Sequence, residues 1–344
     1  MDPPQRRQFL ANIVYLTGAL ASASIVTADE APPTWEPPAP DLERRVKVRG
    51  GSIYVRLNGR STAGRTPVIF LHGGPGSNHA DFLPALALAD ERPVILYDQL
   101  DAGLSDQPNK QRNWSVERFV SEIDAIRAYF DLDEVHLVGH SWGTAICIEY
   151  AARKPTGLRS LVLGGIYVST RSWVASSIAR LRTLQPAIQE VIDAHEREGS
   201  TTDPAYLQAI VEYNKHFSQR HEQPSYVTTY QRQRGLKLAT VVYKGMWGPC
   251  EIRGKGTLRA YSAESLLSHV AVPTLVMCGQ YDEMSPDAAA PFVKRIPGAR
   301  YLTIPDAGHM FSLDQPNLYV STIRTHLHRM DLAAPVSDNK KSGA

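Results

Sequence analysis

Three residues of this sequence have the types and the chain order of a nucleophile, an acid and a base. Ser141 is the centre of a Gly-x-Ser-x-Gly pattern, and Asp282 and His309 each follow a run of apolar residues. A serine hydroxyl becomes nucleophilic when a histidine takes its proton and a carboxylate orients that histidine. Asp306 is a rival acid, but it shares the loop of the histidine, so we expect Asp282 to serve. The three residues predict acyl transfer through an acyl-enzyme.

The residues around Ser141 predict a strand, a sharp turn and a helix. Val135 to Val138 is an apolar, β-favouring run, and residues 144–150 have a helical composition. A serine at the apex of such a turn has strained backbone angles, and the glycines at 139 and 143 leave room for it. The amides of the following helix point at the place where an oxyanion would form. This order predicts a nucleophile elbow.

Two backbone amides are needed to hold the oxyanion. One is the N–H of Trp142, which directly follows the nucleophile. We expect the other from Gly74, in the His-Gly-Gly-Pro-Gly loop at 72–76 after the apolar run at 68–71. Glycines let the backbone of such a loop approach a reacting carbonyl closely.

Strand and helix patterns alternate along the chain. This alternation predicts the α/β class, with a doubly wound, mostly parallel sheet whose chemical loops gather at the carboxyl ends of the strands. A hairpin is expected at 45–48 and 53–57, and the later strands at 67–71, 93–97, 135–138, 158–163, 272–278 and 299–304. Core helices are expected at 116–130, from 142 onward and at 318–328.

The pattern changes between about residues 171 and 247, where no buried-strand run occurs. Helical patterns at 178–195 and 206–217 predict a helical insertion over the sheet. The folded chain is therefore divided into a first core part at 42–166, a helical cap at 167–260, a second core part at 261–332 and a flexible tail at 333–344.

The first residues have the pattern of an export signal. Arg6-Arg7 is followed by Phe9-Leu10, residues 8–28 carry no charge, and small residues of the cleavage type end the run. This pattern predicts a Tat-type signal peptide at 1–28, a proline-rich linker at 29–41, and a periplasmic or secreted protein. The alternatives are an uncleaved N-terminal membrane anchor and a cytoplasmic protein with a disordered tail.

Composition excludes several other classes of protein. The chain has 344 residues and a formal net charge of +2, which favours neither nucleic acid nor an anionic membrane as partner. Its 3 cysteines lie far apart, so we expect no disulfide framework and no cysteine metal site. We expect Cys147 and Cys278 to be small buried side chains. Surface or helix positions are expected for His195, His216, His221, His269, His326 and His328.

Five motifs follow one another in a recognisable order. They are His72-Gly73-Gly74-Pro75-Gly76, Tyr97-Asp98-Gln99, Gly139-His140-Ser141-Trp142-Gly143, Met246-Trp247-Gly248-Pro249-Cys250-Glu251 and Gly279-Gln280-Tyr281-Asp282-Glu283. From about residue 42 to 327 the chain resembles the proline iminopeptidase family of α/β hydrolases, which also contains L-amino-acid amidases. The resemblance implies an α/β-hydrolase fold with a helical cap.

The resemblance also implies two residues that bind the substrate. In that family two glutamates hold the free α-amino group, and these positions map to Glu251 and Glu283. A free α-amine has a reference pKa of about 7.7–8.0, so it is mostly protonated at neutral pH. Two carboxylates would bind it by charge-assisted hydrogen bonds and would block extension of the peptide past its first residue.

Some positions depart from the family pattern. Asp101 and Leu104 stand where the family usually has Gly and Arg, and Thr144 replaces a second glycine after the elbow. Cys250 and Ile252 flank Glu251. These departures bear on the pocket for the first residue and on the preference for proline, and they leave the triad intact.

The sequence predicts a serine hydrolase that releases an N-terminal residue, preferentially proline, from small peptides or amino-acid amides. No metal or organic cofactor is needed, and no stable membrane partner beyond the export machinery is expected. The alternatives are an L-amino-acid amidase, an esterase-like capped hydrolase acting on small neutral substrates and, more remotely, a non-catalytic ligand-binding protein on the same fold.

Overall fold

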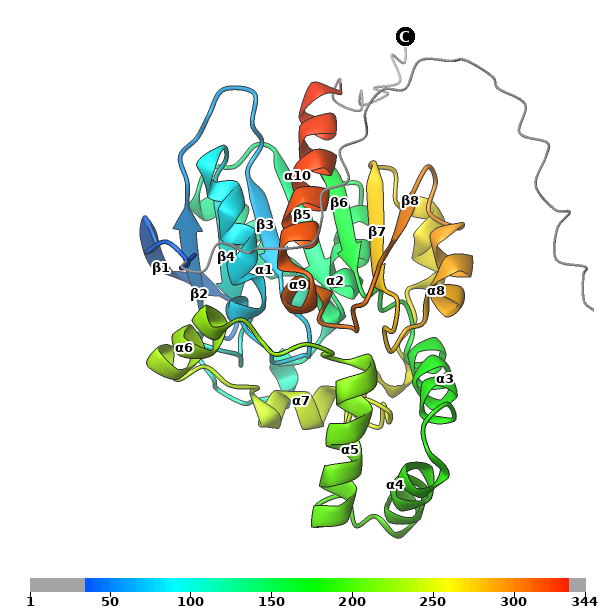
Figure 1. Cartoon of the computed structure of the whole chain (residues 1–344). Coiled ribbons are helices and arrows are strands. Elements are labelled where there is room, and N and C mark those ends of the chain that lie inside the picture. Colours follow the sequence, from blue (N-terminus) through cyan, green and yellow to red (C-terminus); the bar gives the residue numbers. More distant parts are fainter. Residues whose placement is uncertain (1–34, 334–344) are drawn as a thin grey trace, which may run out of the picture. The chain divides into compact units, whose positions relative to one another are not determined.

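The computed structural model describes residues 35–333 (Figure 1). The export signal, most of the proline-rich linker and the tail beyond residue 333 lie outside the described residues. Eight strands form one sheet in the order β1-β2-β4-β3-β5-β6-β7-β8. The strands are β1 (Leu42–Val48), β2 (Gly51–Asn58), β3 (Val68–Leu71), β4 (Val94–Asp98), β5 (Val135–His140), β6 (Leu158–Gly164), β7 (Thr274–Gly279) and β8 (Arg300–Ile304).

The sheet is parallel from β4 to β8. Only β2 runs against its neighbours, because it pairs antiparallel with both β1 and β4. Every residue of β3, β4, β5 and β7 is buried, as expected for parallel strands that helices cover on both faces. The predicted α/β class and the mostly parallel sheet are confirmed.

Helices cover the two faces of the sheet (Figure 1). On one face α10 packs against η1 and β6, and on the other α2 packs against β5 and α1, with α8 beside β7 and β8. Their bounds are η1 (His79–Asp90), α1 (Val116–Tyr129), α2 (Trp142–Ala152), α8 (Pro286–Val293), α9 (Phe311–Asp314) and α10 (Pro316–Leu332). Shorter 3₁₀ turns are η2 (Gln111–Asn113), η3 (Thr257–Ala260) and η4 (Glu264–His269).

Between β6 and β7 the chain forms a helical cap, in the lower part of Figure 1. Its helices are α3 (Thr170–Leu181), α4 (Pro186–Glu198), α5 (Pro204–Phe217), α6 (Ser225–Arg234) and α7 (Thr240–Met246). The cap has a small hydrophobic cluster of its own, in which Leu181, Ile192 and Tyr213 are fully buried.

The helix expected at 178–195 is wrong as a single element, because the chain turns between α3 and α4. Pro186 lacks a backbone N–H and takes the first position of α4. The residue before a proline is pushed out of the helical region, and Gln185 has φ −59° and ψ 140°. Apolar periodicity on both sides of the turn concealed this break.

His326 occupies a helix position, but its side chain is buried and not at the surface. It lies on α10 with 2% of its surface exposed, and burial lowers its pKa to about 4. The three cysteines are buried and unpaired. Across residues 35–333, no helix combines the length and apolar character needed to cross a membrane.

Candidate active site

Ser141 lies at the turn between β5 and α2. Its φ of 53° is in the left-handed region, and its N–H donates to Gly164 O at 2.8 Å. A Cβ atom at Gly139 would lie 2.5 Å from Gly143 O, and one at Gly143 would lie 2.1 Å from Leu71 O. Because only glycine fits at these two places, the turn has the tight geometry of a nucleophile elbow.

The threonine that replaces a family glycine braces this turn. Thr144 is fully buried, and its hydroxyl donates to Ser141 O at 2.6 Å. The same hydroxyl accepts the Tyr167 N–H at 2.8 Å. The departure from the family pattern therefore adds two hydrogen bonds beside the nucleophile.

Asp282 and His309 meet beyond the ends of β7 and β8. His309 Nδ1 lies 2.9 Å from Asp282 Oδ1, and both side chains are buried. Asp282 also accepts the Met284 N–H at 3.2 Å. This leaves Nε2 as the ring nitrogen available for proton transfer.

Asp306, the rival acid, does not approach His309 through its carboxylate. Its side chain is exposed and forms ion pairs with His221 at 3.1 Å and Arg220 at 3.5 Å. The structure thus brings Asp282, and not Asp306, to the base.

The surroundings of His309 shift its proton affinity. Burial lowers the pKa of His309, but the charge and hydrogen bond of Asp282 and the charges of Glu283 and Glu251 raise it more, to about 9. The ring centroid of His309 lies 4.6 Å from that of His140, the residue before Ser141. Burial and the charge of His309 hold the pKa of His140 well below its usual value, so His140 is a neutral neighbour.

The glycine loop after β3 approaches Ser141 directly. A Cβ atom at Gly73 would lie 2.9 Å from Ser141 Cβ, and one at Gly74 would lie 2.6 Å from Gly76 N. Gly74 has φ +105°, which a residue with a side chain rarely adopts. A larger residue at either position would push the loop away from the nucleophile.

The Tyr-Asp-Gln motif holds this loop in place. The Gln99 N–H donates to His72 Nε2 at 3.0 Å, and the Gln99 side-chain amide donates to His72 O at 2.8 Å. The indole N–H of Trp142 donates to Gln99 Oε1 at 2.9 Å. One glutamine therefore links Trp142 to His72, the residue that begins the glycine loop carrying Gly74.

A small cavity opens at Ser141. Core and cap both contribute to it, and four of its nine lining residues are aromatic. The lining residues are Gly74, Pro75, Ser141, Trp142, Tyr167, Trp173, Trp247, Glu251 and Leu258. The aromatic side chains in this lining favour an apolar group of a substrate beside the nucleophile.

Two carboxylates face this region with few partners. Glu283 is 1% exposed, and neither of its carboxylate oxygens has a hydrogen-bond partner among the described residues. Glu251 reaches the cavity and accepts a hydrogen bond from the Tyr243 hydroxyl. Burial raises the pKa of both carboxyl groups, and Glu251 raises that of Glu283 further. Among the described residues, neither carboxylate has a side chain of opposite charge within ion-pair distance, although both interact with the charge of His309.

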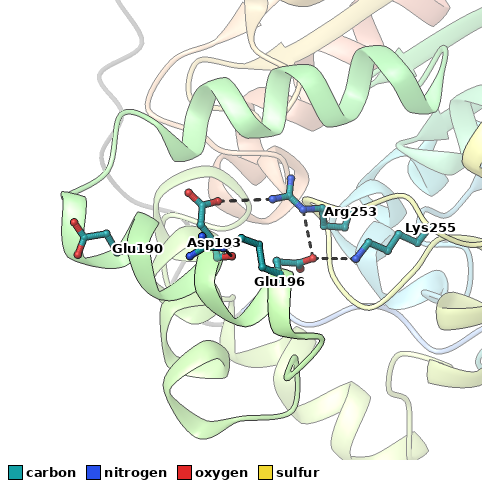
Figure 2. A pocket seen from close by; sticks show the side chains of 6 residues that line it. Glu190, Asp193, Glu196, Arg253 and Lys255 are labelled. Carbon is teal, nitrogen blue, oxygen red and sulfur yellow. Dashed lines mark hydrogen bonds and ion pairs between the residues drawn. The ribbon is translucent and has the colours of Figure 1, made fainter.

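The loop that carries Glu251 is tied to the cap helix α4 (Figure 2). Glu196 of α4 is almost buried and lies 3.4 Å from Arg253 Nε and 3.2 Å from Lys255 Nζ. Its carboxylate also accepts the Tyr206 hydroxyl at 2.6 Å. A hollow of about 480 Å³ lies here, lined by Glu190, Asp193, Glu196, Arg197, Arg253 and Lys255. Its acids and bases balance, so it has no preference for one sign of charge.

Sequence reasoning did not find these supporting residues. Glu196 and Tyr243 stand in helices whose sequence gives no sign of a partner. Arg253 and Lys255 did carry a signal, since both follow the expected Glu251 within four residues.

Comparisons with known proteins agree with the motifs. Residues 66–316 match the family model of the alpha/beta hydrolase fold. A proline iminopeptidase of Heyndrickxia coagulans is 35% identical over 82% of this chain and 97% of the relative. One of Lactiplantibacillus plantarum is 34% identical over 82% of this chain and 99% of the relative. The crystal structure of the Mycobacterium smegmatis proline iminopeptidase has a TM-score of 0.77 and 30% identity, covering 85% of this chain and 99% of that one.

Proposed function

The chain belongs to the proline iminopeptidase family of α/β hydrolases, and from that premise we propose that it is a serine aminopeptidase releasing an N-terminal residue, preferentially proline. The observation that carries the proposal is a pair of buried, interacting carboxylates: Glu251 lines the cavity of Ser141, and Glu283, next to Asp282, has no hydrogen-bond partner among the described residues. We call this pair the amine clamp. Buried carboxylates without a cation are costly, so a substrate ammonium would supply the missing charge.

The proposed reaction builds on the hydrogen bond between His309 and Asp282 and on the place of Ser141 at the elbow. His309 takes the proton of Ser141 through Nε2 while Asp282 holds Nδ1. The serine oxygen attacks the carbonyl of the first residue, and the Gly74 and Trp142 amides hold the oxyanion. His309 then gives its proton to the leaving amine, the C–N bond breaks, and an acyl-enzyme forms. Water attacks this ester by the same route and releases the free amino acid.

The amine clamp would set where the peptide is cut. An ammonium bound by two buried carboxylates fixes the first residue with its carbonyl at Ser141. A peptide with an additional residue would place a neutral amide beside Glu251 and Glu283, where no donor replaces the lost charge. The enzyme would therefore remove one residue at a time.

We also propose that the protein is exported through the twin-arginine route. The support is the Arg6-Arg7 pair before an uncharged run at 8–28, all outside the described residues. The test is cell fractionation of the full chain beside an R6K/R7K double variant. Wild-type protein outside the cytoplasm and the variant inside would support export, and equal cytoplasmic location of both would refute it.

The test of the reaction is a paired rate. Prolyl-anilide and its N-acetylated twin are offered to the protein, with Ser141→Ala as blank and Glu251→Gln beside it. We expect cleavage of the free amine alone, and loss of about 2–5 kcal/mol of transition-state binding in Glu251→Gln, the cost of breaking a buried charge pair. Equal cleavage of both substrates, with a normal rate for Glu251→Gln, would identify a general esterase or amidase instead.

A further inference from the structure

The loop of the catalytic base is hydrogen-bonded to the cap through its own backbone. The N–H of His309 donates to Phe217 O at 2.8 Å, and the N–H of Met310 donates to Ser218 O at 2.7 Å. Phe217 ends the cap helix α5. A Cβ atom at Gly308 would lie 2.7 Å from Ser218 O, so the glycine before the base permits this approach.

A single carboxylate accepts hydrogen bonds from both sides of this junction. Asp314, at the end of α9, accepts the Gly308 N–H at 2.8 Å through Oδ2. Its Oδ1 accepts the N–H groups of Arg220 at 3.1 Å and His221 at 3.0 Å, both from the cap segment that follows α5. The Arg220 N–H also lies 3.2 Å from Oδ2, so the one carboxylate binds both the base loop and the cap.

The charge of Asp314 is balanced by these amides alone. Its side chain is 7% exposed, and among the described residues no cationic side chain is within ion-pair distance of it. The Arg220 guanidinium instead lies near Asp306 and over the Tyr281 ring. Hydrogen bonds from backbone N–H groups to a buried carboxylate are strong and directional. They therefore fix the position of the backbone that donates them.

The cap also holds the loop of the catalytic acid. Arg180 of α3 donates to Asp282 O at 2.9 Å and to Gln280 O at 3.1 Å. The Ser176 hydroxyl of the same helix donates to Glu283 O at 2.7 Å. The acid and the base therefore both sit on loops whose backbone is bonded to the cap.

We propose that Asp314 is a positioning residue that couples the cap to the catalytic base, so that His309 keeps its place only while the segment 217–221 is docked. The proposal rests on the role of His309 in the proposed function, but not on the identity of the substrate. Displacing a catalytic group by about 1 Å can cost about 100-fold in rate, and asparagine cannot serve here because its NH₂ would face an amide N–H.

The test compares Asp314→Asn with Glu222→Gln, a control that makes the same change from carboxylate to amide at an exposed position of the cap. The readout is the rate of inactivation by a small uncharged serine phosphonate, which reports Ser141 and His309 and does not need the amine clamp. We expect a loss of about 10- to 100-fold for Asp314→Asn and no change for the control. With prolyl-anilide, kcat should fall while KM stays within about twofold. A rise in KM at unchanged inactivation rate would overturn the proposal.

Hydrogen exchange of the wild-type protein keeps the proposal testable if Asp314→Asn fails to fold. We expect peptides covering 215–222 and 306–312 to exchange at matching rates, and both to slow in the phosphonate adduct. Fast exchange of 215–222 beside a fully protected 306–312 would show that the cap moves without the base, and would refute the coupling. Inertness of wild-type protein toward the phosphonate would instead refute the proposed function.

Discussion

Replacing Glu283 by glutamine removes one of the negative charges that hold a proton on His309. Asp282, Glu283 and Glu251 together raise the pKa of His309 from 6.5 to about 9 against the opposing effect of burial. This difference is worth about 3.4 kcal/mol at 1.36 kcal/mol per pH unit. Asp282 contributes most and Glu283 comes next. We therefore expect Glu283→Gln to lower the pKa of His309 by up to about one pH unit, or about 1.4 kcal/mol.

The sign of the effect follows from the role of the base. His309 must be neutral to accept the serine proton, so its activity is lost as the pH falls through its pKa. A lower pKa extends activity toward acid, and the acid limb of the profile should move down by up to about one pH unit. Binding of a substrate ammonium to the amine clamp acts in the same direction, because it neutralises the same charges.

The assay is the inactivation rate by an uncharged phosphonate between pH 5 and 10, which reports the free enzyme and tolerates loss of amine binding. Glu222→Gln is the control, because Glu222 is exposed on the cap. An unmoved acid limb in Glu283→Gln, or one displaced toward higher pH, would show that the clamp carboxylates do not set the proton affinity of His309.

Three further outcomes are expected. Thr144→Val leaves a buried backbone amide without its acceptor and should lower the free energy of unfolding by about 1–3 kcal/mol, measured as a lower urea midpoint at unchanged slope. Asp331→Asn removes the charge that pairs with the buried Arg92 at 2.9 Å and that lies 3.1 Å from His136, and should cost about 3 kcal/mol at pH 7. Burial raises the pKa of Asp331, but the hydrogen bond from His136 and a neighbouring arginine lower it more. That stabilisation is therefore present above the unfolded-state pKa of about 3.9 and disappears in acid, so wild-type and variant melting temperatures should converge there. Glu196→Gln should raise the KM for prolyl-anilide several-fold without changing the phosphonate rate, whereas Glu190→Gln on the exposed side of α4 should change neither.

The local part of the site could be predicted from the sequence because its signals are local. A strand, a glycine-flanked serine and a helix are adjacent in the chain, and Asp282 and His309 each follow the strand that delivers them. The break before Pro186 could have been read from the proline itself, but apolar periodicity on both sides obscured it.

The supporting contacts could not be predicted in this way. Asp314 meets Arg220 across 94 residues, and His136 meets Asp331 across 195. The sequence around a buried acid does not indicate which distant backbone N–H groups will donate hydrogen bonds to it. Such pairings follow from the register of the cap on the core, which no single stretch of sequence encodes.

The hydrogen bond from His309 to Phe217 has a consequence for chimeras in which the cap of one such enzyme replaces that of another. A cap inserted between two strands looks like an exchangeable module, and a chimera would be cut at the ends of β6 and β7. In this protein, such a graft would replace the backbone carbonyls that accept hydrogen bonds from the loop of His309. It would also place Asp314 against the backbone of a different cap. A functional exchange would have to carry the stretch 308–314 together with the cap, although β7, α8 and β8 separate them in the chain. The residues that must be exchanged together are therefore not contiguous in the chain. Changes in the cap are limited by a loop that lies outside it.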